Sequence, residues 1–143
     1  MNPIDIHRAA REGDIDAVRT FLEWGGDVHE LDWCDCEPLY YAVKHDQLEI
    51  AQLLLSAGGR IDRNSKLRGD PIGAAVWNVN PRMLKFVVSA GADVNRLRYG
   101  KPPLDLLDSL RSYTKDGPEM VAELDEFKQL LVSVGARRAR DDT

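Results

Sequence analysis

Apolar residues recur along the chain in one repeated helical pattern. Within each copy they stand one, four or five positions apart, a spacing that brings side chains to one face of a helix. The sets recur at a fixed period of about 33 residues: Ala17, Phe21 and Leu22, then Ile50, Leu54 and Leu55, then Met83, Val87 and Val88. Each copy ends at a glycine, Gly25, Gly58 or Gly91, and glycine is the usual left-handed stop after a helix. The pattern predicts three short amphipathic helices.

A second landmark lies upstream of each of these helices and predicts another helix. The apolar residues Ile6, Leu39, Ile72 and Leu104 recur at the same period, shortened by one position in the last interval, and proline precedes the last three directly. Proline suits the first position of a helix because its missing N–H would have no partner there. Glu37 and Asp70, just before two of these prolines, place carboxylates where the N–H groups of a helix end point.

The chain therefore divides into units of two helices each. We expect one all-α domain, residues 1–137, with repeats at about 3–32, 33–65, 66–98 and 99–137, followed by a flexible tail at 138–143. One helix pair cannot bury its apolar face alone, whereas four stacked pairs can.

The repeated motifs resemble the ankyrin repeat, whose period is about 33 and whose signature is Thr-Pro-Leu-His-x-Ala. Segments 4–9, 37–42 and 70–75 match it in part, and segments 54–59 and 87–95 match the repeat ending. The threonine is absent from every unit, and the histidine is retained only as His7, which indicates a structural role for that residue. The resemblance covers about residues 3–137. It implies an ankyrin-repeat solenoid of about four helix-turn-helix repeats, with hairpin fingertips and a concave face of first helices that bind proteins.

An insertion of twelve positions makes the fourth unit longer than the others. Its first helix is expected to extend past Leu104, Leu107 and Leu110, with a break at 115–118 and a longer second helix from about Pro118. The apolar stripe of that helix is Met120, Leu124, Phe127, Leu131 and Val134. Two interpretations stay open: an enlarged C-terminal capping repeat, or an extension of the binding face at about 108–119.

Aligning the units brings large side chains to the expected binding face. Trp33, Tyr41, Trp77 and Tyr99 are expected to project there, and aromatic residues anchor interfaces because they bury much area at low entropic cost. Trp24, at the end of a second helix, is expected to lie outside this face. The predicted partner-binding residues are Trp33, Tyr41, Lys44, His45, Trp77, Asn78, Arg98, Tyr99, Arg8, Arg11, Asp32, Asp35, Lys66 and Arg68.

Charge is segregated along the expected fingertips. Residues 27–37 carry five acidic groups and no lysine or arginine, whereas the next two fingertips are rich in basic residues. This is either a bipolar rim that orients a partner or solvated charge that partly cancels. The net charge of −5 disfavours a nucleic-acid or anionic membrane partner.

Little in the chain indicates chemistry. His29, Cys34 and Cys36 could be imagined as metal ligands, but no further Cys or His pair lies within reach to complete a zinc site. No nucleophile, base and oxyanion donor occur together, so we expect no enzyme, no cofactor and no metal. The absence of an apolar run of about 20 residues, of a signal-like start and of a disulfide framework favours the cytoplasm.

Three functional hypotheses follow. The first is a small stand-alone module, monomeric, that neutralises a partner enzyme by occlusion, as an immunity protein or antitoxin does; the partner would be a toxic enzyme, one of basic character given the acidic chain. The alternative is a scaffold or adaptor that joins cellular proteins. The third, an enzyme or metal-dependent regulator, is disfavoured.

Overall fold

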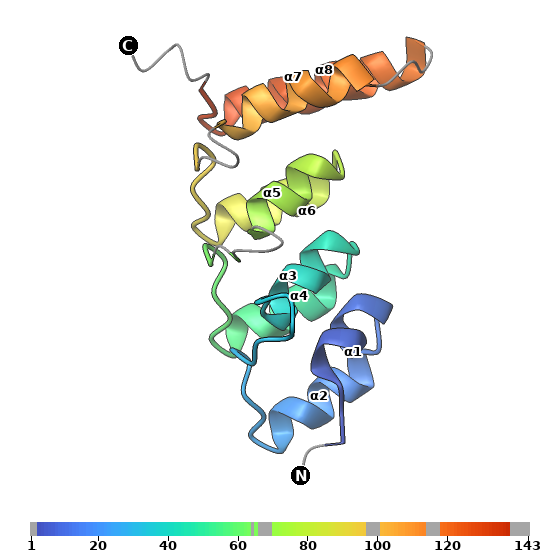
Figure 1. Cartoon of the computed structure of the whole chain (residues 1–143), viewed down its shortest axis with the longest axis vertical. Coiled ribbons are helices and arrows are strands. Elements are labelled where there is room, and N and C mark those ends of the chain that lie inside the picture. Colours follow the sequence, from blue (N-terminus) through green and yellow to red (C-terminus); the bar gives the residue numbers. More distant parts are fainter. Residues whose placement is uncertain (1–2, 64, 66–69, 97–100, 114–117, 138–143) are drawn as a thin grey trace.

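The computed structural model describes residues 3–63, 65, 70–96, 101–113 and 118–137, with no side chains described at 110–113 and 118–120. These residues form eight α-helices stacked as four pairs, with α1 and α8 at opposite ends of the stack (Figure 1). The helices are α1 (Ile6–Glu12), α2 (Ile15–Glu23), α3 (Pro38–Lys44), α4 (Leu48–Ser56), α5 (Pro71–Trp77), α6 (Pro81–Ser89), α7 (Pro103–Tyr113) and α8 (Pro118–Ser133). Apart from isolated bridges at Ser65 and Lys101, the described residues contain no strand. The predicted all-α repeat solenoid is confirmed.

Local side chains set where several helices begin. Asp5, Asp14, Asp70 and Asn80 precede α1, α2, α5 and α6, and each accepts a hydrogen bond from a backbone N–H of the first turn. Glu37 was expected to do the same for α3, and this was wrong. Its side chain makes no capping bond and instead accepts hydrogen bonds from the backbone and guanidinium of Arg60.

The core lies between the stacked pairs and consists of the residues that the repeat pattern marked. Leu39, Leu54, Met83 and Leu131 are fully buried, and each such side chain stabilises the fold by about 1.5–3 kcal/mol relative to an exposed one. The neighbouring positions Leu22, Leu55 and Val88 are partly buried against this core. The predicted apolar face is therefore confirmed.

The fourth pair is longer than the others, as the insertion predicts. Helices α7 and α8 have 11 and 16 residues, whereas α5 and α6 have seven and nine. In Figure 1 they extend beyond the ends of α5 and α6. Leu124, Phe127 and Leu131 are buried along α8, as expected of its apolar stripe. The predicted break lies mostly outside the described residues, and the predicted tail lies wholly outside them.

The tight turns within the first three pairs share one backbone feature. Gly13, Asp46 and Val79, which are equivalent positions of successive units, have positive φ angles of 84°, 59° and 50°. Side chains link neighbouring turns: Asn80 donates to the Asp46 carboxylate at 2.9 Å, and Asn78 donates to the Lys44 carbonyl at 2.6 Å. The turns therefore form a ladder along one side of the stack, and Figure 1 shows the connections between pairs on the other side.

Candidate functional site

The exposed side of the first helices carries a row of three equivalent residues. Arg11, Lys44 and Trp77 occupy the same position in α1, α3 and α5, and these helices pack against one another in order. Arg11 is exposed, Lys44 is half-buried, and Trp77 is 61% exposed. We call these three residues the first-helix row. Two cations and a large aromatic thus occupy one register position on three successive helices.

The row is electropositive beside α3. Burial and the nearby charges of Lys44 and Arg11 lower the pKa of His45, so this imidazole is neutral at pH 7. Within the described residues no carboxylate forms an ion pair with Arg11 or Lys44, although the Lys44 ammonium lies 5.9 Å from the Tyr40 ring centre. Arg8, also exposed, pairs with Glu12 at 3.1 Å. The row can therefore attract a surface that combines acidic and apolar groups.

The first finger, residues 27–37, is held by the carboxylate of Asp32. One oxygen accepts hydrogen bonds from the backbone N–H groups of Cys34 and Cys36, at 2.9 and 3.0 Å, and the other accepts from the Tyr41 hydroxyl at 2.5 Å. Burial alone would raise the pKa of Asp32, but these hydrogen bonds lower it below its ordinary value. Trp33, next to this carboxylate in the chain, is 84% exposed. The finger therefore presents an aromatic side chain on a fixed loop.

Tyr41 does not project from the surface, which corrects the sequence-based expectation. It is only 8% exposed, and its ring packs edge-on against His7 at a centroid distance of 5.9 Å. Burial and the hydrogen bond to Asp32 raise the pKa of Tyr41 far above its ordinary value. The side chain points inward because its hydroxyl donates a hydrogen bond to the Asp32 carboxylate of the finger. Tyr41 thus supports the first finger.

His7 has the structural role that the sequence indicated. It is buried, and its Nε2 lies 2.8 Å from the Glu30 carbonyl and 2.9 Å from the Cys36 carbonyl. It therefore ties α1 to both ends of the first finger.

Acidic and basic fingertips pair with each other across neighbouring repeats. Asp35 pairs with Arg63 at 2.9 Å and Glu37 with Arg60 at 2.8 Å. The third finger repeats the arrangement more loosely, since Arg96 lies 3.6 Å from Asp70. Of the two interpretations of the segregated charge, the described residues favour mutual cancellation. Asp32 and Asp35, predicted to contact a partner, are engaged within the protein.

Four predicted site residues, Lys66, Arg68, Arg98 and Tyr99, lie outside the described residues. Of the remaining ten, His45, Asn78, Arg8, Arg11, Trp33 and Trp77 are exposed. Trp24, predicted to lie outside the binding face, is 61% exposed at the end of α2.

The two cysteines are buried within the first finger and are not joined by a disulfide. Burial raises the pKa of the Cys36 thiol, which keeps it protonated and unreactive at neutral pH. Within the described ranges, no three His, Cys, Asp or Glu side chains gather as metal ligands would. No helix in the described part of the chain has both the length and the apolar character needed to cross a membrane.

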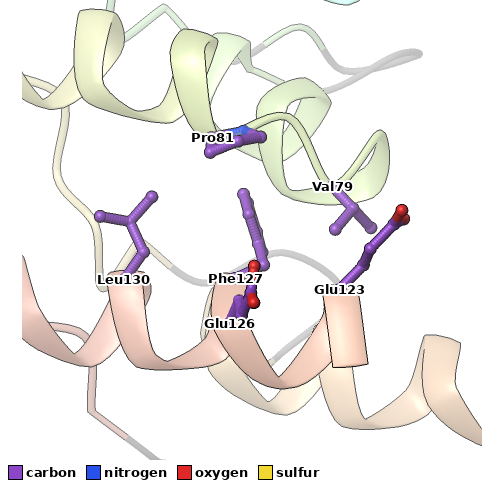
Figure 2. Close-up of a pocket in the computed structure, with 6 residues that line it drawn as sticks. All are labelled: Val79, Pro81, Glu123, Glu126, Phe127 and Leu130. Carbon is purple, nitrogen blue, oxygen red and sulfur yellow. The ribbon is translucent and has the colours of Figure 1, made fainter. Parts of the chain in front are cut away.

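A pocket of about 490 Å³, which the sequence did not indicate, opens between the α5–α6 turn and α8. Figure 2 shows its lining residues: Val79, Pro81, Glu123, Glu126, Phe127 and Leu130. A comparison of equivalent turn positions could have indicated this pocket, because valine stands at position 79 where the earlier turns have glycine and aspartate.

Comparison with known proteins agrees with the repeat structure. Residues 6–98 match the family model for ankyrin repeats in three copies. The ankyrin repeat and LEM domain-containing protein 1 homolog of Caenorhabditis elegans is 33% identical over 87 residues, which are 60% of this chain and 12% of that protein. Inversin of Danio rerio is 29% identical over 93 residues, 65% of this chain and 9% of inversin.

A bacterial relative matches a larger share of its own length. YahD of Escherichia coli K12, named as an ankyrin repeat protein, is 29% identical over 93 residues, 65% of this chain and 46% of YahD. The matched segments thus span less than half the length of each of these three relatives. Ankyrin repeats form protein–protein interaction modules that are generally non-enzymatic. The chain belongs to the ankyrin-repeat family.

Proposed function

We propose that the chain is a non-enzymatic module that binds one protein through the first-helix row and the first finger, and that it neutralises this partner by covering its active site. An immunity protein or antitoxin acts in this way. The proposed surface combines two exposed tryptophans with Arg11 and Lys44, which form no ion pair with a carboxylate among the described residues.

The observation that carries the proposal is the presentation of Trp33. Its side chain is 84% exposed, yet the loop beside it is held by three hydrogen bonds to Asp32. A preorganised loop loses little entropy on binding, so more of the contact energy appears as affinity. A buried tryptophan is among the side chains most often found to dominate an interface.

The first-helix row supports a particular chemistry for the contact surface. Arg11 and Lys44 lie beside Trp77 in the stack, and their charges act on His45. We therefore expect the partner to present carboxylates around an apolar patch. The overall acidity of the chain favoured a basic partner, but the acidic fingertips Asp35 and Glu37 are already paired with arginines.

Covering an active site requires no chemistry from the module itself. Two buried cysteines without a disulfide suit a reducing compartment, and we place the module in the cytoplasm on that ground. An adaptor function is the second candidate. The pocket beside α8 favours it, because an adaptor needs a second surface.

Alanine variants test the binding face once a partner has been captured on the immobilised full chain and identified. Trp33→Ala and Trp77→Ala should each weaken binding at least 30-fold by calorimetry, equivalent to about 2 kcal/mol, the threshold of a hot spot. Trp24→Ala is the matched control, because Trp24 and Trp77 are both 61% exposed. All three variants should keep the wild-type melting temperature.

Two results would count against this function. Equal affinities for the Trp24, Trp33 and Trp77 variants would remove the proposed face. A partner enzyme that remains fully active when saturated with the chain would exclude occlusion and favour the adaptor.

A further inference from the structure

The pocket beside α8 lies where the ladder of turns stops. Between the second and third pairs, Asn80 and Arg82 reach the Asp46 side chain at 2.9 and 2.8 Å. Above the third pair, the longer α8 lies over the α5–α6 turn, and its side chains face Val79 and Pro81. The enlarged fourth pair thus leaves the third turn beside a cavity.

The floor of this pocket is apolar. Figure 2 shows Phe127 directed from α8 toward Pro81, with Leu130 to one side and Val79 to the other. A volume of about 490 Å³ is within the range of sites that bind small molecules or anchor side chains, about 300–1,000 Å³. It can take one or two aliphatic side chains.

Val79 makes the wall of this pocket more apolar than the equivalent turns of the earlier repeats. Its φ of 50° lies in the left-handed region, which a β-branched side chain adopts only under strain. The equivalent turn positions hold Gly13 and Asp46, and glycine adopts this conformation freely. The Val79 side chain packs in part against the core, and its remaining surface lines the pocket.

Two carboxylates stand at the rim of the pocket. Glu123 and Glu126 are exposed, one helical turn apart on α8, and neither forms an ion pair with another described residue. Like charges at this spacing repel each other. A cation from outside would relieve that repulsion, so the rim favours a positively charged group beside the apolar floor.

We propose that this pocket is a second docking site, for a segment of another protein that presents a leucine-sized apolar side chain next to lysine or arginine. None of the residues that line the pocket belongs to the first-helix row or the first finger, although Val79 is only two residues from Trp77. The apolar side chain enters between Val79 and Leu130, and the basic group pairs with Glu123 or Glu126.

Synthetic peptides provide the probe. Arg-Leu-Leu-Arg, Glu-Leu-Leu-Glu and Arg-Ser-Ser-Arg, each with blocked ends, are titrated into the full chain while the methyl resonances of Val79 and Leu130 are followed by NMR. The first peptide should shift both resonances saturably. The acidic peptide should bind at least tenfold more weakly, and the serine peptide should leave both methyl groups unchanged. Equal responses to the acidic and basic peptides would overturn the proposal.

Three variants distinguish a loss of peptide binding at the pocket from a loss of fold stability. Val79→Asn should keep a melting temperature close to that of the wild type, because asparagine tolerates the left-handed conformation and this offsets the partial burial lost at position 79. It should bind the basic leucine peptide at least fivefold more weakly. Glu126→Gln should weaken binding at least threefold with the fold unchanged. The control is Val132→Asn, at an α8 position that is 54% exposed and outside this pocket.

Two further outcomes would overturn the proposal. One is wild-type peptide binding by both the Val79 and the Glu126 variants. The other is no response to any peptide together with methyl shifts on dilution and a dimer in sedimentation, which would make the occupant a second copy of this chain.

Discussion

Replacing Asp32 with alanine tests whether one carboxylate organises the first finger. The substitution removes the acceptor of three hydrogen bonds, from the backbone N–H groups of Cys34 and Cys36 and from the Tyr41 hydroxyl. The hydroxyl belongs to a residue that is 8% exposed, so water has little access to replace the lost acceptor.

The size of the expected destabilisation follows from the hydrogen-bond donors that lose their acceptor. A buried donor that loses its partner costs about 1–3 kcal/mol, and a partly buried amide that water can reach lies near the lower end of that range. Taking about 2 kcal/mol for the Tyr41 hydroxyl and about 1 for each amide, Asp32→Ala should destabilise the fold by about 4 kcal/mol. For a chain of this size the melting temperature should fall by about 10–15 °C.

A double-mutant cycle isolates the side-chain bond. Tyr41→Phe removes the hydroxyl but leaves the two amide bonds to Asp32, so it should cost about 1–1.5 kcal/mol. Phenylalanine at position 41 leaves no hydroxyl to be stranded when Asp32 is also replaced. The double variant should therefore be about 1.5 kcal/mol more stable than the sum of the single effects, measured by urea unfolding.

The pH dependence gives a second measurement of the same carboxylate. The folded-state pKa of Asp32 lies below its ordinary value of 3.8. Its contribution to stability is therefore fully present above that value and is lost as the pH falls through the lower folded-state pKa. Asp32→Asn should show a smaller loss of stability than the wild type on acidification from pH 5 to about pH 2.

Two results would refute this account of the finger. One is an Asp32→Ala variant that loses less than about 1 kcal/mol, the size of one ordinary hydrogen bond. The other is additivity in the cycle with Tyr41→Phe, since groups joined by a buried hydrogen bond should be coupled.

Two other substitutions test contacts between and within repeats. Gly59→Ala places a Cβ 2.8 Å from the Leu54 carbonyl oxygen and should destabilise the fold by about 2 kcal/mol, as overpacking does. Ala92→Gly, at the equivalent position of the next repeat, should destabilise it by at most about 1 kcal/mol. Equal shifts in melting temperature for the two variants would contradict the steric argument. Arg60→Ala removes the guanidinium beside Glu37, whose side chain is 3% exposed. Because Arg60 itself is half exposed, we expect the free energy of unfolding to fall by about 1–2 kcal/mol, less than for a fully buried pair. A urea midpoint equal to that of the wild type would show that the ion pair does not stabilise the fold.

The helices and their buried positions were predictable because they depend on local spacing. Leu54 and Met83 share a helical register with their counterparts in other repeats, and each is fully buried. The extra length of α7 and α8 followed from the insertion in the fourth unit. Stacking requires every repeat to bury the same face, so the positions that recur as apolar residues in each repeat predict the core.

The surface was less predictable because equivalent positions have different neighbours. Arg8 and Tyr41 share a register position, yet Arg8 is exposed and Tyr41 is buried. The difference arises from Asp32, whose carboxylate accepts the Tyr41 hydroxyl. Likewise, alignment assigned Glu37 to a helix cap, whereas Arg60, far along the chain in the next finger, holds its carboxylate. Register does not specify such pairings, since they depend on the loop conformation.

The departures of the chain from its own repeat provide the strongest guide to function. Glycine at position 13 adopts the turn conformation without strain, so the backbone of the turn does not require valine at position 79, where the side chain packs in part against the core. Nor does it require Trp77 where Arg11 and Lys44 stand, since both polar side chains occupy that position in intact repeats. Residues that depart from the repeat in this way are the ones that we propose to contact something outside the chain. The Trp77 and Val79 variants therefore test the same principle on two surfaces, one proposed to meet an acidic partner and the other a basic segment.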